Sequence, residues 1–144
     1  MALRIELKPG ERILIGDCII TNDDQRAKFL IEGRVPILRE KDIMTVERAV
    51  TPATRIYLAI QLMYTARDPR PHHETYFSLM NDLLQAAPST GRYVEIINNH
   101  ILTGELYKAL KKAQELITYE QELLSNAESG ASLRKGRKAD LQSA

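Results

Sequence analysis

The hydrophobic pattern changes its period partway along the chain, and this change limits the folds open to it. Near the N-terminus, Leu3, Ile5 and Leu7 alternate with charged residues, which is the period of two of a half-buried strand. From about residue 51 onward, apolar residues such as Ile56 and Ile60 recur every three or four positions, as on one face of an amphipathic helix. The pattern predicts an α+β protein whose strands all precede its helices.

Turn-forming residues divide residues 1–45 into short strands. The turn signals are Pro9-Gly10, Gly16-Asp17, Asn22-Asp23-Asp24 and Glu32-Gly33-Arg34. The strands expected between them cover residues 3–7, 12–15, 18–21, 27–31 and 35–39. Short strands joined by tight turns favour an antiparallel meander or a small barrel. We therefore expect residues 1–45 to form a small antiparallel five-stranded β module.

Prolines and glycines divide residues 46–126 into four expected helices. Thr51-Pro52 is a typical start, because threonine caps the first turn and proline fits the first helical position. The helices expected from these signals cover residues 52–67, 74–86, 89–103 and 105–125. The apolar stripe of the last helix can pack in the core of the chain or against a partner helix. Residues 127–144 are rich in Ser, Gly, Arg and Lys and predict a flexible basic tail, either solvated or in weak contact with RNA.

Composition excludes several classes of protein. With 144 residues, 44% hydrophobic and 27% charged, the chain suits one globular domain or two small lobes. Its apolar runs are far shorter than the roughly 20 residues of a membrane span, and residues 1–6 do not resemble a secretory signal, so we expect a cytoplasmic protein. A net charge of +1 argues against a bulk cationic surface but permits a local basic patch. Cys18, the single cysteine, is expected to be a buried apolar residue.

No combination of residues predicts catalysis. The glycines lack the spacing of a phosphate-binding loop. His72 and His73 are adjacent, so they point in different directions and make a poor metal site. Asp23-Asp24 has the composition of a turn, and Ser89 is expected to cap a helix rather than act as a nucleophile. The chain is therefore expected to be a binding or regulatory protein, not an enzyme, with no cofactor, no metal, no membrane partner and no small-molecule substrate.

Basic side chains of the β module are the candidate RNA-binding residues. Arginine suits such a role because its planar fork binds phosphate and stacks on unpaired bases. Arg39 is the foremost candidate, followed by Arg4, Lys8, Arg12, Arg34 and Lys41. The alternative is that these cations are solvated partners of neighbouring glutamates such as Glu6 and Glu40.

Four segments are distinctive in their order and spacing. They read LRIELKPGER at 3–12, PILREKDI at 36–43, TPATRIY at 51–57 leading into QLMY at 61–64, and YKALK at 107–111. Over about residues 1–125 the chain resembles the FlbT family of flagellin repressors. The resemblance implies a post-transcriptional repressor of flagellin synthesis in flagellum biogenesis. Such a protein associates with the 5′ untranslated leader of flagellin mRNA, limits its translation and promotes its decay. FlaF, which acts in the opposite direction, and flagellin are the candidate protein partners.

Residues 10–17 and the segment around Arg39 also resemble the carbon storage regulator CsrA. That resemblance implies a strand-exchanged dimer that binds leader RNA containing GGA, with RNA contacts from basic residues of the first and last strands. Arg39 holds the matching position in the last strand. The basic residue of the first strand is replaced by Leu7, with Arg4 and Lys8 on either side, so the RNA-contacting geometry departs from that pattern.

A rival function remains open from the residues alone. The helical half, with its amphipathic helices and the pairs Tyr57/Tyr64 and Tyr76/Phe77, could bind flagellin or a regulatory partner and affect RNA indirectly. An exposed strand edge and a long helix both favour a homodimer.

Overall fold

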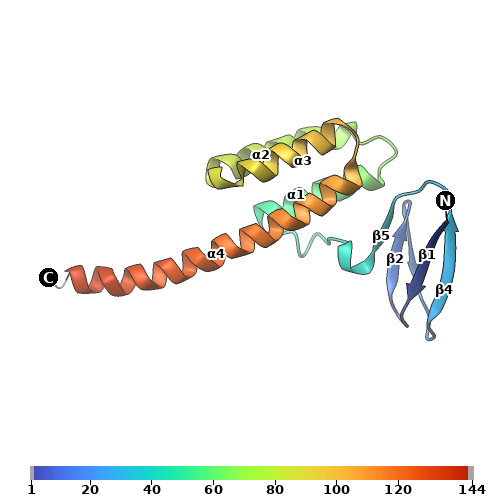
Figure 1. The fold of residues 1–144 in the computed structure, drawn as a ribbon, viewed down its shortest axis with the longest axis horizontal. Coiled ribbons are helices and arrows are strands. Elements are labelled where there is room, and N and C mark those ends of the chain that lie inside the picture. The colour runs from blue at the N-terminus through green and yellow to red at the C-terminus, as the bar shows by residue number, and fades with distance from the viewer. Residues whose placement is uncertain (1, 143–144) are drawn as a thin grey trace. The chain divides into compact units, whose positions relative to one another are not determined.

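The computed structural model describes residues 2–142, and the side chains of residues 2–127. Its strands are β1 (Ala2–Leu7), β2 (Arg12–Ile15), β3 (Cys18–Thr21), β4 (Ala27–Glu32) and β5 (Ile37–Arg39). Its α-helices are α1 (Pro52–Thr65), α2 (His73–Ala86), α3 (Gly91–Leu102) and α4 (Leu106–Gln142). Short 3₁₀ helices lie at Glu40–Asp42, Arg70–His72 and Pro88–Thr90. The α+β class, the five antiparallel strands and the four helices are confirmed (Figure 1).

The chain forms two compact units, the first ending at Met80 and the second beginning at Asn81. This boundary lies inside α2 (His73–Ala86), so the strands and α1 share a unit. The functional division into residues 1–45, 46–126 and 127–144 remains a prediction.

The five strands form two sheets, one of β1 and β4 and one in the order β3-β2-β5. The β module is therefore not a simple meander, because β4 pairs with β1 rather than with β3. Asn22 supplies a physical reason: its side-chain amide donates to the backbone oxygens of Leu7, Lys8 and Gln25 at 3.1, 2.9 and 2.7 Å. These bonds fix the loop before β4 against the end of β1.

The core of the β module consists of the inward side chains of β1 and β2. Ile5, Leu7 and Ile13 are almost fully buried. Partly buried apolar residues of β2, β4 and β5 pack around them: Ile15, Phe29, Ile31 and Ile37. Because side chains alternate along a strand, Arg4 and Glu6 lie on the opposite face of β1 from Ile5 and Leu7.

The start of α1 follows the expectation from sequence. Thr51 is the N-cap, and its hydroxyl accepts a hydrogen bond from the Thr54 N–H at 3.2 Å. The Thr54 hydroxyl accepts in return from the Thr51 N–H at 2.9 Å. Two N–H groups that the helix leaves without a partner are thus satisfied.

In the second unit, α3 and α4 form a helical hairpin. Gly104 turns the chain with a φ of 76°, a conformation that glycine adopts without steric cost. The buried apolar residues of the hairpin are Val94, Ile97 and Ile101 of α3, and Ala109, Leu110, Ala113, Leu116 and Ile117 of α4. Helix α4 continues to Gln142, beyond the end expected near Ser125. The expected flexible tail at residues 127–144 falls almost entirely beyond the described side chains.

Two local expectations were wrong. Cys18 is exposed because, in the described chain, β3 pairs with β2 alone and all four of its side chains face solvent. Ser89 does not cap α3, whose N-cap is Thr90 with no side-chain hydrogen bond. The Ser89 hydroxyl instead accepts a 2.8 Å hydrogen bond from Tyr119.

Across residues 2–142, no helix is both long and apolar enough to cross a membrane.

Candidate nucleic-acid interface

One face of α1 binds the chain segment on both sides of Arg39, the foremost candidate RNA-binding residue. The Tyr64 hydroxyl lies 3.3 Å from the Ile37 N–H and 3.5 Å from its oxygen, and the Tyr57 hydroxyl donates to the Asp42 oxygen at 2.5 Å. Tyr57 and Tyr64 are seven residues apart, which is about two helical turns, so both side chains lie on the same side of α1. The backbone on both sides of Arg39 is therefore fixed by α1.

Gln61 lies between these tyrosines on α1 and completes the attachment. Its side chain accepts from the Met44 N–H at 2.7 Å and donates to the Met44 oxygen at 3.0 Å. Both Gln61 and Met44 are buried. Tyr57 is only 3% exposed, so this aromatic residue serves the internal packing of the chain rather than a partner surface.

Three of the six predicted RNA-binding residues line one surface hollow. Lys8, Arg39 and Lys41 surround it together with Arg26, Glu6 and Glu11. Both carboxylates already have partners, since Glu6 pairs with Arg26 at 2.9 Å and Glu11 accepts from the Lys8 backbone N–H at 2.8 Å. Four cations against two carboxylates leave a local positive excess, which suits an anionic ligand.

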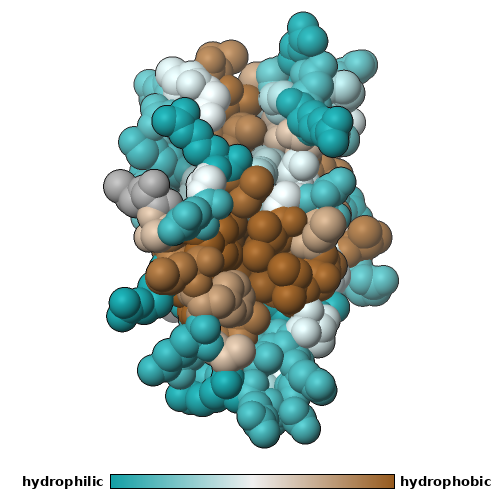
Figure 2. Space-filling model, turned by 90° about the vertical axis from the view of Figure 1, so that its right-hand side faces the viewer, coloured by the Kyte–Doolittle hydropathy of each residue, from teal (hydrophilic) through white to brown (hydrophobic). Residues whose placement is uncertain are grey.

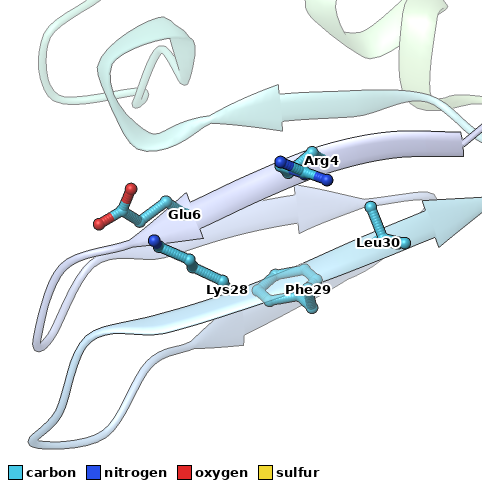
Figure 3. Close-up of a pocket in the computed structure, with 5 residues that line it drawn as sticks. All are labelled: Arg4, Glu6, Lys28, Phe29 and Leu30. Carbon is cyan, nitrogen blue, oxygen red and sulfur yellow. The ribbon is translucent and has the colours of Figure 1, made fainter.

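Arg4 lies on a second hollow, on the outward face of β1 and β4. Figure 3 shows Arg4 and Glu6 on one strand, and Lys28, Phe29 and Leu30 on the other. The register places Arg4 opposite Leu30 and Glu6 opposite Lys28. Because Glu6 lines both hollows, they adjoin along β1. We call the two together the basic strip, defined by Arg4, Lys8, Arg26, Lys28, Arg39 and Lys41.

Arg12 and Arg34 do not line the basic strip. Arg12 pairs with Glu40 at 3.3 Å, which fits the alternative that some of these cations are partners of glutamates. Arg34 is exposed in the loop after β4. It follows the end of the β1–β4 ribbon where Ala2 pairs with Glu32, whereas Lys8 follows the other end. Six residues of strand separate these ends by about 20 Å.

Arg26 is a member of the strip that the sequence did not reveal. It directly precedes β4, whose first residue, Ala27, pairs with Leu7 of β1. Only the pairing of β4 with β1 brings Arg26 next to Glu6 and Lys8. Arg26 and Lys28 are two residues apart and so point to the same face of the extended chain. This spacing would have identified Arg26 as a member of the strip once the β1–β4 pairing was known.

The remaining electrostatic features lie elsewhere. A side-chain hydrogen bond from Arg70 lowers the pKa of Asp68, and one from Lys108 lowers the pKa of Glu105. Within the described residues, no three His, Cys, Asp or Glu side chains gather closely enough to share a metal ion.

The strands also present apolar side chains to solvent. Figure 2 shows a broad hydrophobic area on the face viewed there, with hydrophilic residues around it. The exposed large apolar residues of the β module are Leu3, Ile19, Ile20, Leu30 and Val35. A broad exposed apolar area such as that in Figure 2 is typical of an interaction surface. The strand register puts Leu3 and Leu30 on opposite faces of the β1–β4 ribbon, so these residues do not all belong to one patch.

Comparison with known proteins gives a consistent result. The family model "Flagellar protein FlbT" matches residues 3–124. A "Probable flagellum biosynthesis repressor protein FlbT 1" of Bradyrhizobium diazoefficiens is 52% identical, covering 100% of this chain and 99% of the relative. A protein of Rhodopseudomonas palustris strain TIE-1 is 52% identical over 87% of the chain and 99% of its own length. The "Flagellum biosynthesis repressor protein FlbT" of Caulobacter vibrioides is 32% identical over 92% and 96%. No solved structure matches the chain.

Proposed function

The chain belongs to the FlbT family of flagellar proteins, and we propose that it represses flagellin synthesis by binding the 5′ untranslated leader of flagellin mRNA. Bound protein would limit translation and promote decay of the message. The relatives named as repressors of flagellum biosynthesis support a regulatory role in flagellum assembly. In this proposal the protein acts in the cytoplasm, without catalysing a reaction.

The observation that carries the proposal is the basic strip. Lys8, Arg26, Arg39 and Lys41 surround one hollow, and α1 holds the backbone next to Arg39 through Tyr57, Gln61 and Tyr64. Because the backbone next to Arg39 is held before binding, this segment loses little backbone freedom on binding. Each phosphate contact to a single strand contributes about 0.7 to the slope of log affinity against log salt. Four such contacts give a slope of roughly −3.

A matched pair of arginine variants tests this proposal. Arg39→Ala removes a cation of the strip, whereas Arg34→Ala removes an exposed arginine of the same β module that does not line it. We expect Arg39→Ala to weaken binding to the flagellin leader RNA about tenfold, as for loss of one charge-assisted contact, and to reduce the salt slope by about 0.7. Arg34→Ala is expected to bind like the wild type.

Fluorescence anisotropy with labelled leader RNA gives both quantities, and circular dichroism checks that each variant is folded. Equal affinities of folded Arg39→Ala and Arg34→Ala would contradict the placement of RNA on the strip.

The second candidate function is recognition of a protein, either flagellin or a regulatory partner such as FlaF. It is favoured by apolar residues that the helices leave exposed, of which Leu102 is 72% and Leu124 is 52% exposed. Affinity that hardly changes with salt, together with direct capture of purified flagellin or FlaF, would favour this function over RNA binding.

We also propose that the protein is a homodimer. The apolar residues of β3, Ile19 and Ile20, are 55% and 44% exposed on a strand that pairs with β2 alone in the described chain. An apolar open edge favours pairing with another strand. Light scattering coupled to size exclusion gives the mass directly, and a monomer at micromolar concentration would contradict this part of the proposal.

A further inference from the structure

A cluster of tyrosines and cations lies along the line where α3 and α4 meet, within the second unit. The rings of Tyr93 and Tyr119 lie 5.0 Å apart between centroids and are tilted by 32°. The guanidinium carbon of Arg92 lies 5.0 and 5.4 Å from the two ring centroids, and the ammonium of Lys112 lies 5.5 Å from that of Tyr93. These distances are those of cation–π contacts.

The same line continues toward the turn between the helices. His100, Tyr107, Lys108, Lys111, Lys112 and Glu115 line a surface hollow there. Lys111 lies 5.1 Å from the Tyr107 ring centroid. Since Lys112 belongs to this hollow and also contacts Tyr93, the two groups form one surface. We call it the α3–α4 seam, defined by Arg92, Tyr93, Tyr107, Lys108, Lys111, Lys112 and Tyr119.

The seam is rigid where a ligand would meet it. The Tyr119 hydroxyl is fixed by its 2.8 Å hydrogen bond to Ser89. Ala109 and Ala113 of the same helix are fully buried. From Lys108 to Tyr119, α4 advances by eleven residue steps, which extend about 16 Å at the helical rise.

The seam is also positively charged. Its cations are Arg92, Lys108, Lys111 and Lys112, of which Lys108 pairs with Glu105 at 2.6 Å and Lys112 pairs with Glu115 at 3.4 Å. Among the residues with described side chains, Arg92 has aromatic contacts but no carboxylate partner. Its guanidinium is therefore available to an external anion.

This combination fits single-stranded nucleic acid better than a protein partner. Lysine is depleted from the cores of protein–protein interfaces, whereas three lysines line the hollow of the seam. Proteins that bind single strands combine cations for the backbone with aromatic rings on which bases stack. We infer that the α3–α4 seam is a second contact for single-stranded RNA, where an unpaired base stacks on the tyrosines while the cations bind phosphate. This inference rests on the proposed function, which it extends from the strands to the helical unit.

The test uses the full chain and labelled decauridylate, an unpaired RNA unrelated to any leader. We expect Tyr93→Leu, which removes the ring, to weaken binding about tenfold, the loss typical of one stacked base. Tyr93→Phe keeps the ring and is expected to bind like the wild type. Arg92→Gln is expected to reduce the salt slope by about 0.7, and Arg55→Gln, an exposed arginine of α1, is the matched control.

Thermal unfolding followed by circular dichroism identifies the variants that fold like the wild type. Equal affinities of Tyr93→Leu and Tyr93→Phe overturn base stacking at the seam. Because Tyr93→Leu removes packing area, Arg92→Gln provides the independent readout. A salt slope identical to that of Arg55→Gln overturns the phosphate contact. Failure of the wild type to bind decauridylate, with Arg92-dependent binding of an acidic protein instead, assigns the seam to a protein partner and overturns the inference.

Titration of the same variants against the flagellin leader separates this inference from the proposed function. Loss of leader binding in Arg39→Ala but not in Tyr93→Leu would show that the leader binds the basic strip and does not bind the seam. Loss of leader binding in Tyr93→Leu but not in Arg39→Ala would show that the leader binds the seam and does not bind the basic strip. Loss in both variants supports a single RNA that contacts both units.

Discussion

The side-chain amide of Gln61 makes both of its hydrogen bonds to the main chain of one residue, Met44, at 2.7 and 3.0 Å. Because the two residues are only 7% exposed, water has little access to the groups that replacement would leave unpaired. Gln61→Leu keeps a side chain of similar size but strands one N–H and one C=O of Met44. Each stranded buried group costs about 1–3 kcal/mol, so we expect the free energy of unfolding to fall by about 2–6 kcal/mol.

Urea unfolding followed by circular dichroism measures this loss. With an m-value of about 2 kcal/mol/M for a small protein, the midpoint should fall by roughly 1–3 M. Gln121→Leu makes the same chemical change at an exposed site on α4, where the effect should stay within about 0.5 kcal/mol. If the two variants unfold at the same urea concentration, the Met44 backbone is satisfied in another way, and the attachment of this segment to α1 contributes nothing to stability.

Three further results are expected. Thr51→Ala removes the N-cap of α1 and should lower stability by about 1 kcal/mol, measured by thermal unfolding against Thr118→Ala, an exposed threonine inside α4; equal melting temperatures would contradict the capping role. Burial raises the pKa of Tyr76, so the folded state keeps this proton longer than the unfolded chain and stability should fall as pH rises above about 10. Tyr76→Phe should lose less stability than the wild type over that alkaline range, and identical pH profiles would refute the assignment. Cys18 should react with a thiol reagent in the native protein at nearly the rate of the urea-unfolded chain, and protection of the thiol at monomer concentration would contradict its exposure.

The sequence predicted most of the elements because their signals are local. Alternation identified the strands, and the pair Thr51-Pro52 marked the start of α1, where the structure has both proline and a capping box. The two prolines after Asp68 ended that helix, which stops at Thr65, within two residues of the expected end. Such signals depend only on neighbouring residues, so they are readable without tertiary information.

Strand pairing was harder to predict because it depends on contacts distant in sequence. The three hydrogen bonds of Asn22 direct β4 to β1, yet in sequence Asn22 looks like any turn residue. The same limitation explains the exposed Cys18, since an apolar strand at an open edge reads like a buried one. It also hid Arg26, whose place in the basic strip follows from the β1–β4 pairing.

The candidate site was predicted in part. The sequence named Lys8, Arg39 and Lys41, and the structure places all three around one hollow. It also named Arg12, which pairs with Glu40, and Arg34, which does not line the strip. Charge alone cannot distinguish these cases, because a pattern of residues shows neither which cation has a carboxylate beside it nor which end of the β1–β4 ribbon a cation follows.

The most direct test of the account is a titration of the purified protein with its own flagellin leader RNA and with a scrambled RNA of equal length, at two salt concentrations. We expect tighter binding to the leader and an affinity that falls with a log–log slope of roughly −3, the value for four phosphate contacts to a single strand. Equal binding to the two RNAs, or a slope near zero, would contradict direct recognition of the leader by the basic strip.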